Sequence, residues 1–419
     1  MQQWLGKRIY YGWVVVGVTA LALLVASGVR AASGVLITPL EADLGWSRSA
    51  ISFAIAIGLV LYGLAGPAGG ALIDRYGPRA LMLAGFVLTA TSALLTSAMS
   101  ALWQFTVVWG ALGGLGTGIA ATVLGAAVAN RWFVKRRGLA TGVFGASSSA
   151  GQLLFIPLLL ATIDISGWRA AVLLLALLAT LVLLPVFLLM RDNPSDVGLR
   201  PLGGTDEPQA PQLARAGGVM RGVVRVPDFW LLAGSFFICG ATTIGIIGTH
   251  FLPYADDEGI SKGTAAFALA LLGAMNFAGT IASGWLTDRH DPRKLLAIYY
   301  FFRGLSLFLL PFVGSTWGLV VFATFFGLDY IATVPPTVAL TADLFGRRNI
   351  GTVFGWVFAA HMLGAAVAAW LSGLARDILG DYQLAFMAAG AFSVTAALLA
   401  VRLNREAQPA PQPAPARAR

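Results

Sequence analysis

The sequence has very little charge. Only 11% of its 419 residues are Asp, Glu, Lys or Arg, whereas an average soluble protein has about 25%, and 58% of the residues are hydrophobic. A chain of this composition has too few polar side chains to cover a soluble surface. We therefore exclude an ordinary soluble globular protein and expect the lipid bilayer to be the main solvent of this one.

Cysteine is almost absent. The single cysteine, Cys239, lies inside an apolar segment, which excludes an internal disulfide and a metal cluster held by cysteines. We find no phosphate-binding loop, because the Gly-rich run from Gly110 to Gly118 follows no strand and is better explained by close packing of membrane helices. The sequence also has no metal-ligand cluster and no nucleophile with a nearby base. It therefore predicts no metal, no cofactor and no enzymatic activity, and an ion gradient as the energy source.

Long apolar segments make up most of the chain. A helix needs about 20 apolar residues to cross a bilayer. Clusters of charge, Gly, Pro or Trp divide the sequence into twelve such spans, at residues 11–40, 50–70, 80–99, 102–129, 139–163, 168–190, 229–252, 263–286, 295–313, 317–342, 351–374 and 384–403. We predict an N-terminal six-helix bundle in residues 1–190, a cytoplasmic linker in 191–226, a C-terminal six-helix bundle in 227–403 and a disordered cytoplasmic tail in 404–419.

The positive charges are distributed unevenly between the loops. The net charge of +9 does not indicate nucleic acid as a partner, because the 28 Lys and Arg residues are scattered between apolar segments. If the spans alternate across the bilayer from an N-terminus on the inside, 22 of the 28 lie on the inner side. Such a bias predicts orientation. We therefore expect a multi-pass protein of the bacterial inner membrane with both termini in the cytoplasm.

One loop sequence occurs twice. The run Gly70-Ala-Leu-Ile-Asp-Arg-Tyr-Gly-Pro-Arg79 is matched 214 residues later by Gly284-Trp-Leu-Thr-Asp-Arg-His-Asp-Pro-Arg293. A second match, between residues 141–145 and 351–355, has nearly the same spacing. Two matches at one spacing indicate duplicated halves related by an axis along the membrane normal. The predicted fold class is therefore an all-α membrane protein with twelve transmembrane helices in two pseudo-symmetric six-helix bundles.

The repeated loop resembles the best-known signature of the major facilitator superfamily, Gly-x-x-x-Asp-Arg-x-Gly-x-Arg. The runs Gly45-Trp-Ser-Arg48, Trp132-Phe133 and Gly167-Trp-Arg169 are similar to its bacterial branch related to monocarboxylate transporters and oxalate/formate exchangers. The resemblance covers nearly the whole chain and implies the major facilitator fold. It also implies that the loop charges latch the cytoplasmic side when the carrier faces outward, although they could serve membrane orientation alone. The residues of this predicted gate motif are Gly70, Asp74, Arg75, Gly77, Arg79, Gly284, Asp288, Arg289 and Arg293.

Ionisable residues within the spans are candidates for the substrate pathway, because charge inside a membrane is costly. The resemblance implies that spans one, four, seven and ten surround a central cavity, with two, five, eight and eleven beside them. The candidate substrate-binding residues are Arg30, His250, Asn276, Asp329, Tyr330 and His361. Arg30 offers a planar guanidinium fork to a carboxylate; a structural ion pair and snorkelling to the interface are its alternatives. A packing role is as reasonable for His361.

His250 and Asp329 are the predicted proton-coupling residues. Histidine changes charge near neutral pH, although a neutral histidine bonded to the backbone would have the same sequence. Asp329 lies near mid-membrane, and Pro335-Pro336 should break or bend span ten. The alternative for Asp329 is a structural ion pair with Arg303.

The sequence departs from monocarboxylate carriers in span eight. In those carriers an Arg follows the Asp or Asn of the motif by four residues, whereas here Thr280 follows Asn276. Arg30 lies about one residue from the place of their span-one Lys. We predict proton-coupled uptake of a small organic anion, a carboxylate, by alternating access, in a bilayer and as a possible monomer. The alternatives are a proton-driven exporter of amphipathic or drug-like compounds and a non-transporting membrane sensor.

Overall fold

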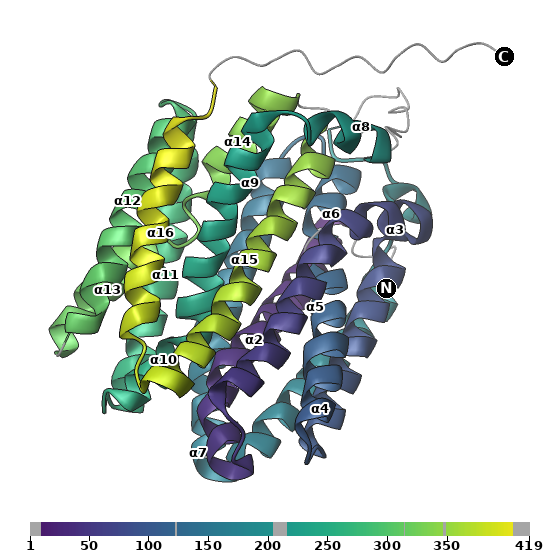
Figure 1. Ribbon diagram of the computed structural model, residues 1–419. Helices are drawn as coiled ribbons and strands as arrows, with labels where there is room; N and C mark the ends of the chain where they lie inside the picture. Colours follow the sequence, from purple (N-terminus) through teal and green to yellow (C-terminus); the bar gives the residue numbers. More distant parts are fainter. Residues whose placement is uncertain (1–9, 122–123, 204–215, 314, 347–348, 405–419) are drawn as a thin grey trace.

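The computed structural model describes residues 10–121, 124–203, 216–313, 315–346 and 349–404. These residues form a bundle of long, roughly aligned helices (Figure 1), and no β-strand of a sheet occurs among them. In chain order the helices are α2 (Gly12–Leu44), α3 (Arg48–Ser97), α4 (Leu102–Phe105), the π-helix η1 (Thr106–Gly113), α5 (Gly114–Ala121), α6 (Leu124–Trp132), α7 (Arg137–Leu189), the 3-10 helix η2 (Pro194–Val197), α8 (Ala216–Val223), α9 (Pro227–Gly240), the π-helix η3 (Ala241–Ile247), α10 (Gly248–Asp257), α11 (Lys262–Thr287), α12 (Pro292–Leu309), the 3-10 helix η4 (Leu310–Phe312), α13 (Thr316–Asp329), α14 (Val334–Phe345), α15 (Ile350–Leu379) and α16 (Gln383–Val401).

The helices agree with twelve membrane crossings. Ten stretches of the described residues are long and apolar enough to cross a bilayer. One of them, α7, has 53 residues and bends at Gly167, where φ is 81°, so it contains two crossings. The described residues between Leu102 and Trp132 supply one more crossing, built from three short α-helices and one π-helix. Positive φ is accessible to glycine at no steric cost, which explains why the bend lies at Gly167.

The hydrophobic core follows the two halves of the sequence. We call residues 10–190 the N half and residues 227–403 the C half. One core cluster contains the buried side chains of the N half together with four from α15, and two further clusters lie within the C half and the end of α8. The halves meet where α3 packs on α15, α2 on α10 and α7 on α11. Gly63 of α3 lies directly against Met362 of α15, so small residues bring these helices close together.

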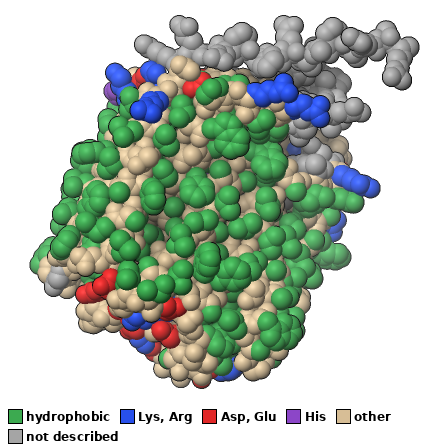
Figure 2. Space-filling view, in the orientation of Figure 1, with side chains coloured by type: hydrophobic (Ala, Val, Ile, Leu, Met, Phe, Trp, Pro, Cys, Tyr) green, Lys and Arg blue, Asp and Glu red, His purple; other side chains and the backbone are tan. Residues whose placement is uncertain are grey.

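The two ends of the bundle differ. The linker end contains Tyr10, α8 and the C-terminal end of α16, and the far end contains the turns at Gly45, Gly259 and Gly380. Hydrophobic side chains cover the middle of the surface in Figure 2, with charged side chains gathered toward both ends. A surface of this kind fits a bilayer around the middle of the bundle.

The region between the halves is partly helical. It contains η2 and α8, and the hydroxyl of Tyr10 donates a 2.8 Å hydrogen bond to the carbonyl of Arg200. Residues 204–215 of this predicted linker lie outside the described residues, as does the predicted disordered tail beyond Asn404. Asn404 itself donates through its backbone and its side-chain amide to the Asp228 carboxylate, at 2.9 Å each.

Candidate functional site

A central cavity of about 60 Å³ lies between the two halves. Most of its lining is apolar. Its polar side chains are few and come from both halves: Arg30 of α2, Gln152 of α7, Thr249 of α10, and Tyr330, which follows α13. A few polar groups on an apolar wall are typical of sites that bind small organic molecules.

Arg30 reaches this cavity without a carboxylate partner among the described residues. Its Nη1 donates to the Tyr62 hydroxyl and its Nη2 to the Ser27 hydroxyl, both at 3.2 Å. The guanidinium carbon also lies 5.5 Å from the centre of the Tyr62 ring. Both hydrogen-bonding partners are neutral, so the positive charge of Arg30 is not compensated by a described acidic residue. A guanidinium has five N–H donors, and these contacts leave several for a ligand.

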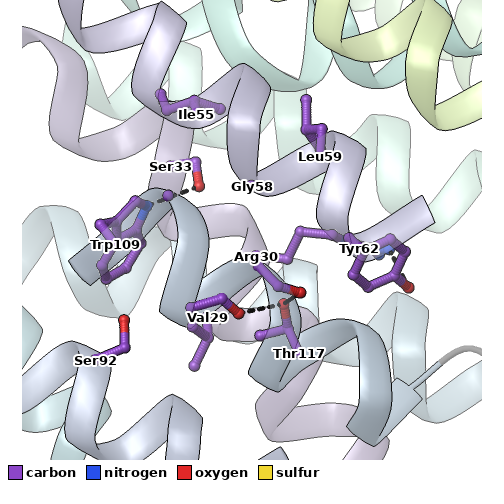
Figure 3. A pocket seen from close by; sticks show the side chains of 13 residues that line it. Val29, Arg30, Ser33, Ile55, Gly58, Leu59, Tyr62, Ser92, Trp109 and Thr117 are labelled. Carbon is purple, nitrogen blue, oxygen red and sulfur yellow. Dashed lines mark hydrogen bonds between the residues drawn. The ribbon is translucent and has the colours of Figure 1, made fainter. Parts of the chain in front are cut away.

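Arg30 also borders a second, smaller cavity of about 40 Å³ inside the N half. Figure 3 shows Arg30 reaching toward Tyr62, and the indole of Trp109 directed at Ser33, to which its Nε1 donates at 3.2 Å. Glycines of η1 and α5 form one wall. A Cβ at Gly114 would lie 2.5 Å from the Cα of Gly58 in α3, so this Gly-rich run serves close helix packing.

Span ten is broken at the cavity. α13 ends at Asp329 and α14 begins at Val334, directly before Pro335-Pro336, as predicted. Side chains from neighbouring helices bind the backbone groups that the break exposes. The Asn276 Oδ1 accepts from the Ile331 N–H at 3.2 Å, and the Ser283 hydroxyl donates to the Ala332 carbonyl at 2.5 Å. Asn276 therefore contacts the break next to Tyr330, and it is not among the residues that line the central cavity.

The Arg303–Asp329 ion pair lies behind this break. The Arg303 Nε is 2.9 Å from Asp329 Oδ2, and the two side chains are 0% and 7% exposed. Arg303 Nη2 also donates to the Asp329 carbonyl at 2.7 Å, and Nη1 contacts the Cys239 sulfur at 2.9 Å. Of the two possibilities for Asp329, the structure has the pair with Arg303, which also satisfies the last carbonyl of α13.

His250 lies at the far end of the bundle and not in the central cavity. Its Nε2 is 2.7 Å from the Ala369 carbonyl, which can only accept, so Nε2 carries the proton. Its Nδ1 is 3.1 Å from the Tyr382 hydroxyl, which also accepts from Arg48 at 3.2 Å. Burial raises the pKa of Tyr382 to about 12, against the smaller lowering effect of Arg48, so this hydroxyl remains protonated.

His361 is held in an aromatic and backbone environment. Its Nδ1 is 3.1 Å from the Phe236 carbonyl, and its ring packs against the rings of Phe236 and Phe358. The imidazole is buried. These contacts belong to packing within the C half.

A cluster of charged residues joins the halves at the far end, and we call it the far-end latch: Glu41, Arg48, Asp257, Arg376 and Asp377. Arg48 binds Asp257 with two hydrogen bonds of 2.6 and 2.8 Å, and it also pairs with Glu41 at 2.7 Å. Arg376 pairs with Asp257 at 2.7 Å. Because Arg48 belongs to the N half and Asp257 to the C half, this cluster holds the halves together. A second ion pair between the halves, Lys262–Asp164, lies at the same end.

Sequence reasoning missed the far-end latch. The run that ends at Arg48 was noticed only for its resemblance to a family, and acidic residues in predicted loops gave no sign of their partners. The one available signal was that Arg48 is among few basic residues on a side where acidic residues are common.

The first gate-motif loop contacts the start of the linker, and the second makes contacts within its own half. Gly77 has a φ of 79°, and the Arg79 N–H beside it donates to Asp192 at 2.8 Å. In the second loop, Arg293 pairs with Asp291 at 2.6 Å and donates to the Leu403 carbonyl at 2.9 Å. Arg289 donates to the Trp285 carbonyl, Arg75 stacks on Tyr76, and Asp288 is exposed. The side chain of Asp74 and the surroundings of Gly70 lie outside the described part of the chain.

Two helical halves around a cavity at mid-height, with the halves joined by ion pairs at one end, define a polytopic membrane transporter. Comparison with known proteins gives the same class. The family model of the Major Facilitator Superfamily matches residues 19–289 and 241–419. The chain belongs to the Major Facilitator Superfamily. It is a transporter and not an enzyme, and the predicted major facilitator fold is confirmed.

Several relatives are similar over most of their length. Monocarboxylate transporter 13 of Bos taurus is 29% identical over 384 residues, covering 91% of this chain and 87% of the relative. The uncharacterized MFS-type transporter YcxA of Bacillus subtilis (strain 168) is 28% identical over 346 residues, covering 80% and 81%. The solved D-xylose-proton symporter has the same fold, with a TM-score of 0.74 at 16% identity over 94% of this chain and 98% of that one.

Proposed function

We propose that this chain is a secondary carrier that takes up a small organic anion, a carboxylate, together with a proton. The observation that carries the proposal is Arg30. It supplies a guanidinium to the cavity between the halves, its hydrogen bonds go to neutral hydroxyls, and no described carboxylate pairs with it. A half-buried positive charge without a described acidic partner favours an anionic ligand. The similarity to monocarboxylate transporters supports a carboxylate as that ligand.

In this proposal the anion lies between Arg30 and Tyr330. The two residues line the same cavity from opposite halves. The bound carboxylate accepts from the guanidinium, and Tyr330 contributes a hydroxyl from the broken span ten. Asn276 holds the broken segment of span ten by accepting a hydrogen bond from the Ile331 N–H. His361 supports the site through its packing in the C half. A ligand that contacts both halves stabilises arrangements in which they are close, which is the basis of rocking between two facing states.

His250 is the residue we propose for proton coupling. A proton on Nδ1 adds a positive charge close to Arg48 and removes the acceptor for the Tyr382 hydroxyl. Both effects weaken the far-end latch, and the nearby carboxylates of Asp257 and Asp377 offset only part of the added charge. Protonation from the far side therefore favours opening of that side. Asp329 was the second predicted coupling residue, and its buried pair with Arg303 supports a structural role instead.

We also propose that the linker end faces the cytoplasm of a bacterial cell, as the basic residues at that end suggest. The two halves, residues 1–190 and 227–403, then move as bodies around the cavity. A Cys239→Ser protein with one new cysteine tests the orientation. A membrane-impermeant maleimide added to intact cells should label Glu258→Cys at the far end and leave Ser195→Cys at the linker end unlabelled; the opposite pattern would reverse the orientation.

Uptake into proteoliposomes tests the proposed function. A panel of labelled small carboxylates is supplied with and without an inward proton gradient. We expect gradient-driven uptake by the native protein and a 10- to 100-fold higher half-saturating concentration in Arg30→Ala, because a charge-assisted hydrogen bond contributes about 1.5–3 kcal/mol. The matched control is Arg402→Ala, which removes an exposed arginine outside the cavity. Unchanged uptake by Arg30→Ala would reject Arg30 as the anchor.

A proton-driven exporter of amphipathic compounds is the second candidate, and the apolar lining of the cavity favours it. Ile156, Ile244 and Leu272 are part of that lining. In this case no carboxylate would be taken up, and addition of an amphipathic compound would release protons across the membrane in the opposite sense. The direction of substrate-stimulated proton movement therefore separates the two candidates.

A further inference from the structure

A third cavity opens on the apolar outer surface of the molecule, next to α8. It has a volume of about 390 Å³, and we call it the lateral groove. Its walls include Leu64 of α3, Trp230 of α9 and Trp356 of α15, whose side chains are 47%, 62% and 43% exposed. The groove is therefore separate from the central cavity and opens on the outer surface of the bundle.

The chemistry of the groove fits a hydrocarbon chain. The residues that line it are Val, Leu, Met, Phe, Trp and Ala only. None has a charged side chain, and the indole Nε1 of Trp230 already donates to the Val224 carbonyl at 2.8 Å. A polar ligand would lose its hydrogen bonds with water here and gain none. In a bilayer, the groups at hand to fill such a groove are lipid acyl chains.

Two arginines stand directly beside the groove. Met220 and Val224 line it, and Arg221 and Arg225 follow them immediately in the sequence. Both arginines are exposed, and neither guanidinium has a hydrogen-bond or ion-pair partner among the described residues. They belong to the linker end, where the apolar surface gives way to charged side chains. Exposed arginines at this height lie level with the lipid headgroups, and a guanidinium attracts phosphate.

We propose that the lateral groove binds an anionic phospholipid, with an acyl chain in the groove and its phosphate between Arg221 and Arg225. The proposal is independent of which solute the carrier moves. A phospholipid is the proposed occupant because the apolar lining matches its acyl chain and the two adjacent positive charges match its phosphate.

The bound lipid would contact both halves. Leu64 belongs to the N half and Trp356 to the C half, while α8 lies between the halves in the sequence. When the halves change their relative position, the walls of the groove must move apart or together. A lipid that fits one arrangement better shifts the population toward it. The groove therefore links the composition of the membrane to the facing of the carrier.

Quenching of tryptophan fluorescence tests this proposal. The protein is reconstituted in phosphatidylethanolamine vesicles that contain increasing fractions of phosphatidylglycerol, or separately of phosphatidylcholine, each with brominated acyl chains. The signal of the groove is the difference between the native protein and the Trp230→Phe/Trp356→Phe variant. We expect brominated phosphatidylglycerol to quench this signal at a fraction about 30-fold lower, because each basic residue contributes about 1 kcal/mol to binding an anionic lipid.

The control variants separate the groove from general attraction to basic protein. Arg221→Gln/Arg225→Gln should remove the difference between the two lipids, and Arg402→Gln, which changes an exposed arginine near the end of α16, should retain it. All of these substitutions are on the surface, so the folded protein is available for measurement. Equal quenching by both lipids overturns the proposal. Absence of quenching together with a dimeric mass also overturns it, since a second copy of the chain would then cover the groove.

Discussion

Replacing Arg303 by methionine should destabilise the protein strongly and disturb the substrate site at the same time. Arg303 is fully buried and makes contacts with the Asp329 carboxylate, the Asp329 carbonyl and the Cys239 sulfur. The substitution keeps an apolar stem and removes the charge. Asp329 then remains as a buried carboxylate without its partner, and the carbonyl at the end of α13 loses its donor.

The expected cost follows from these contacts. Removing one partner of a buried ion pair costs about 3–5 kcal/mol, because the other charge remains desolvated. Removing both charges costs far less, since an apolar pair of similar volume is often neutral. The variant Arg303→Met/Asp329→Leu should therefore be more stable than Arg303→Met alone by about 2–4 kcal/mol. Thermal unfolding of the purified protein in detergent, followed by tryptophan fluorescence, measures both variants.

An uptake measurement distinguishes a role of Arg303 in positioning the substrate site from a role in stability alone. Arg303 holds the end of α13 directly before Tyr330, so the double variant should recover stability and still have an altered half-saturating concentration for the substrate. Arg303→Lys keeps the charge but loses the fork that binds Asp329 twice, and it should lie between native protein and Arg303→Met. If Arg303→Met unfolds within about 1 kcal/mol of the native protein, or if the double variant is no more stable than the single one, the reasoning is wrong.

Three further predictions concern the far end and the break. Arg48→Gln should loosen the far-end latch by removing the bonds to Asp257. A membrane-impermeant thiol reagent should then label a cysteine introduced beside the latch faster than it does with Arg48 in place. Equal labelling rates would argue against a latch. His250→Gln should flatten the rise of uptake at acidic pH, where a buried histidine takes up a proton, whereas the native carrier should become faster as the pH falls because protonation weakens the latch; an unchanged pH profile would exclude His250. Asn276→Leu should leave the Ile331 N–H buried without an acceptor and lower stability by about 1–3 kcal/mol in the same unfolding assay, with no change expected if water replaces the amide oxygen.

The fold was largely predictable from the sequence. Apolar segments of sufficient length are a local property of the chain, and the cost of leaving a backbone polar group unsatisfied in lipid forces each of them into a helix. The repeated Gly-x-x-x-Asp-Arg run around Asp74 and Asp288 pointed to duplicated halves because it is read directly from the order of residues. The break of span ten was also predictable, since Pro335-Pro336 cannot continue the helix before it.

The site was predictable only in part. The sequence singled out Arg30 and Tyr330, and the structure has both on the central cavity. The sequence alone could not separate these two residues from His250, which lies beside the far-end latch, or from Asp329, which lies behind the break. All of these residues are polar groups within apolar segments, so the sequence presents them alike. Whether such a group faces a cavity or a partner depends on the rotation of its helix and on residues far away in the chain.

The sequence by itself thus determined that the chain spans a membrane, how many times it does so and where a duplicated half begins. Each of these rests on local hydrophobicity, on the positive charges of loops and on repeated motifs. Only the tertiary structure decided that Arg303 neutralises Asp329, that Arg48 binds Asp257 across the halves, and that Arg30 has no described acidic partner. These three outcomes depend on distances of about 3 Å between side chains that are tens to hundreds of residues apart, and packing of the helices sets those distances.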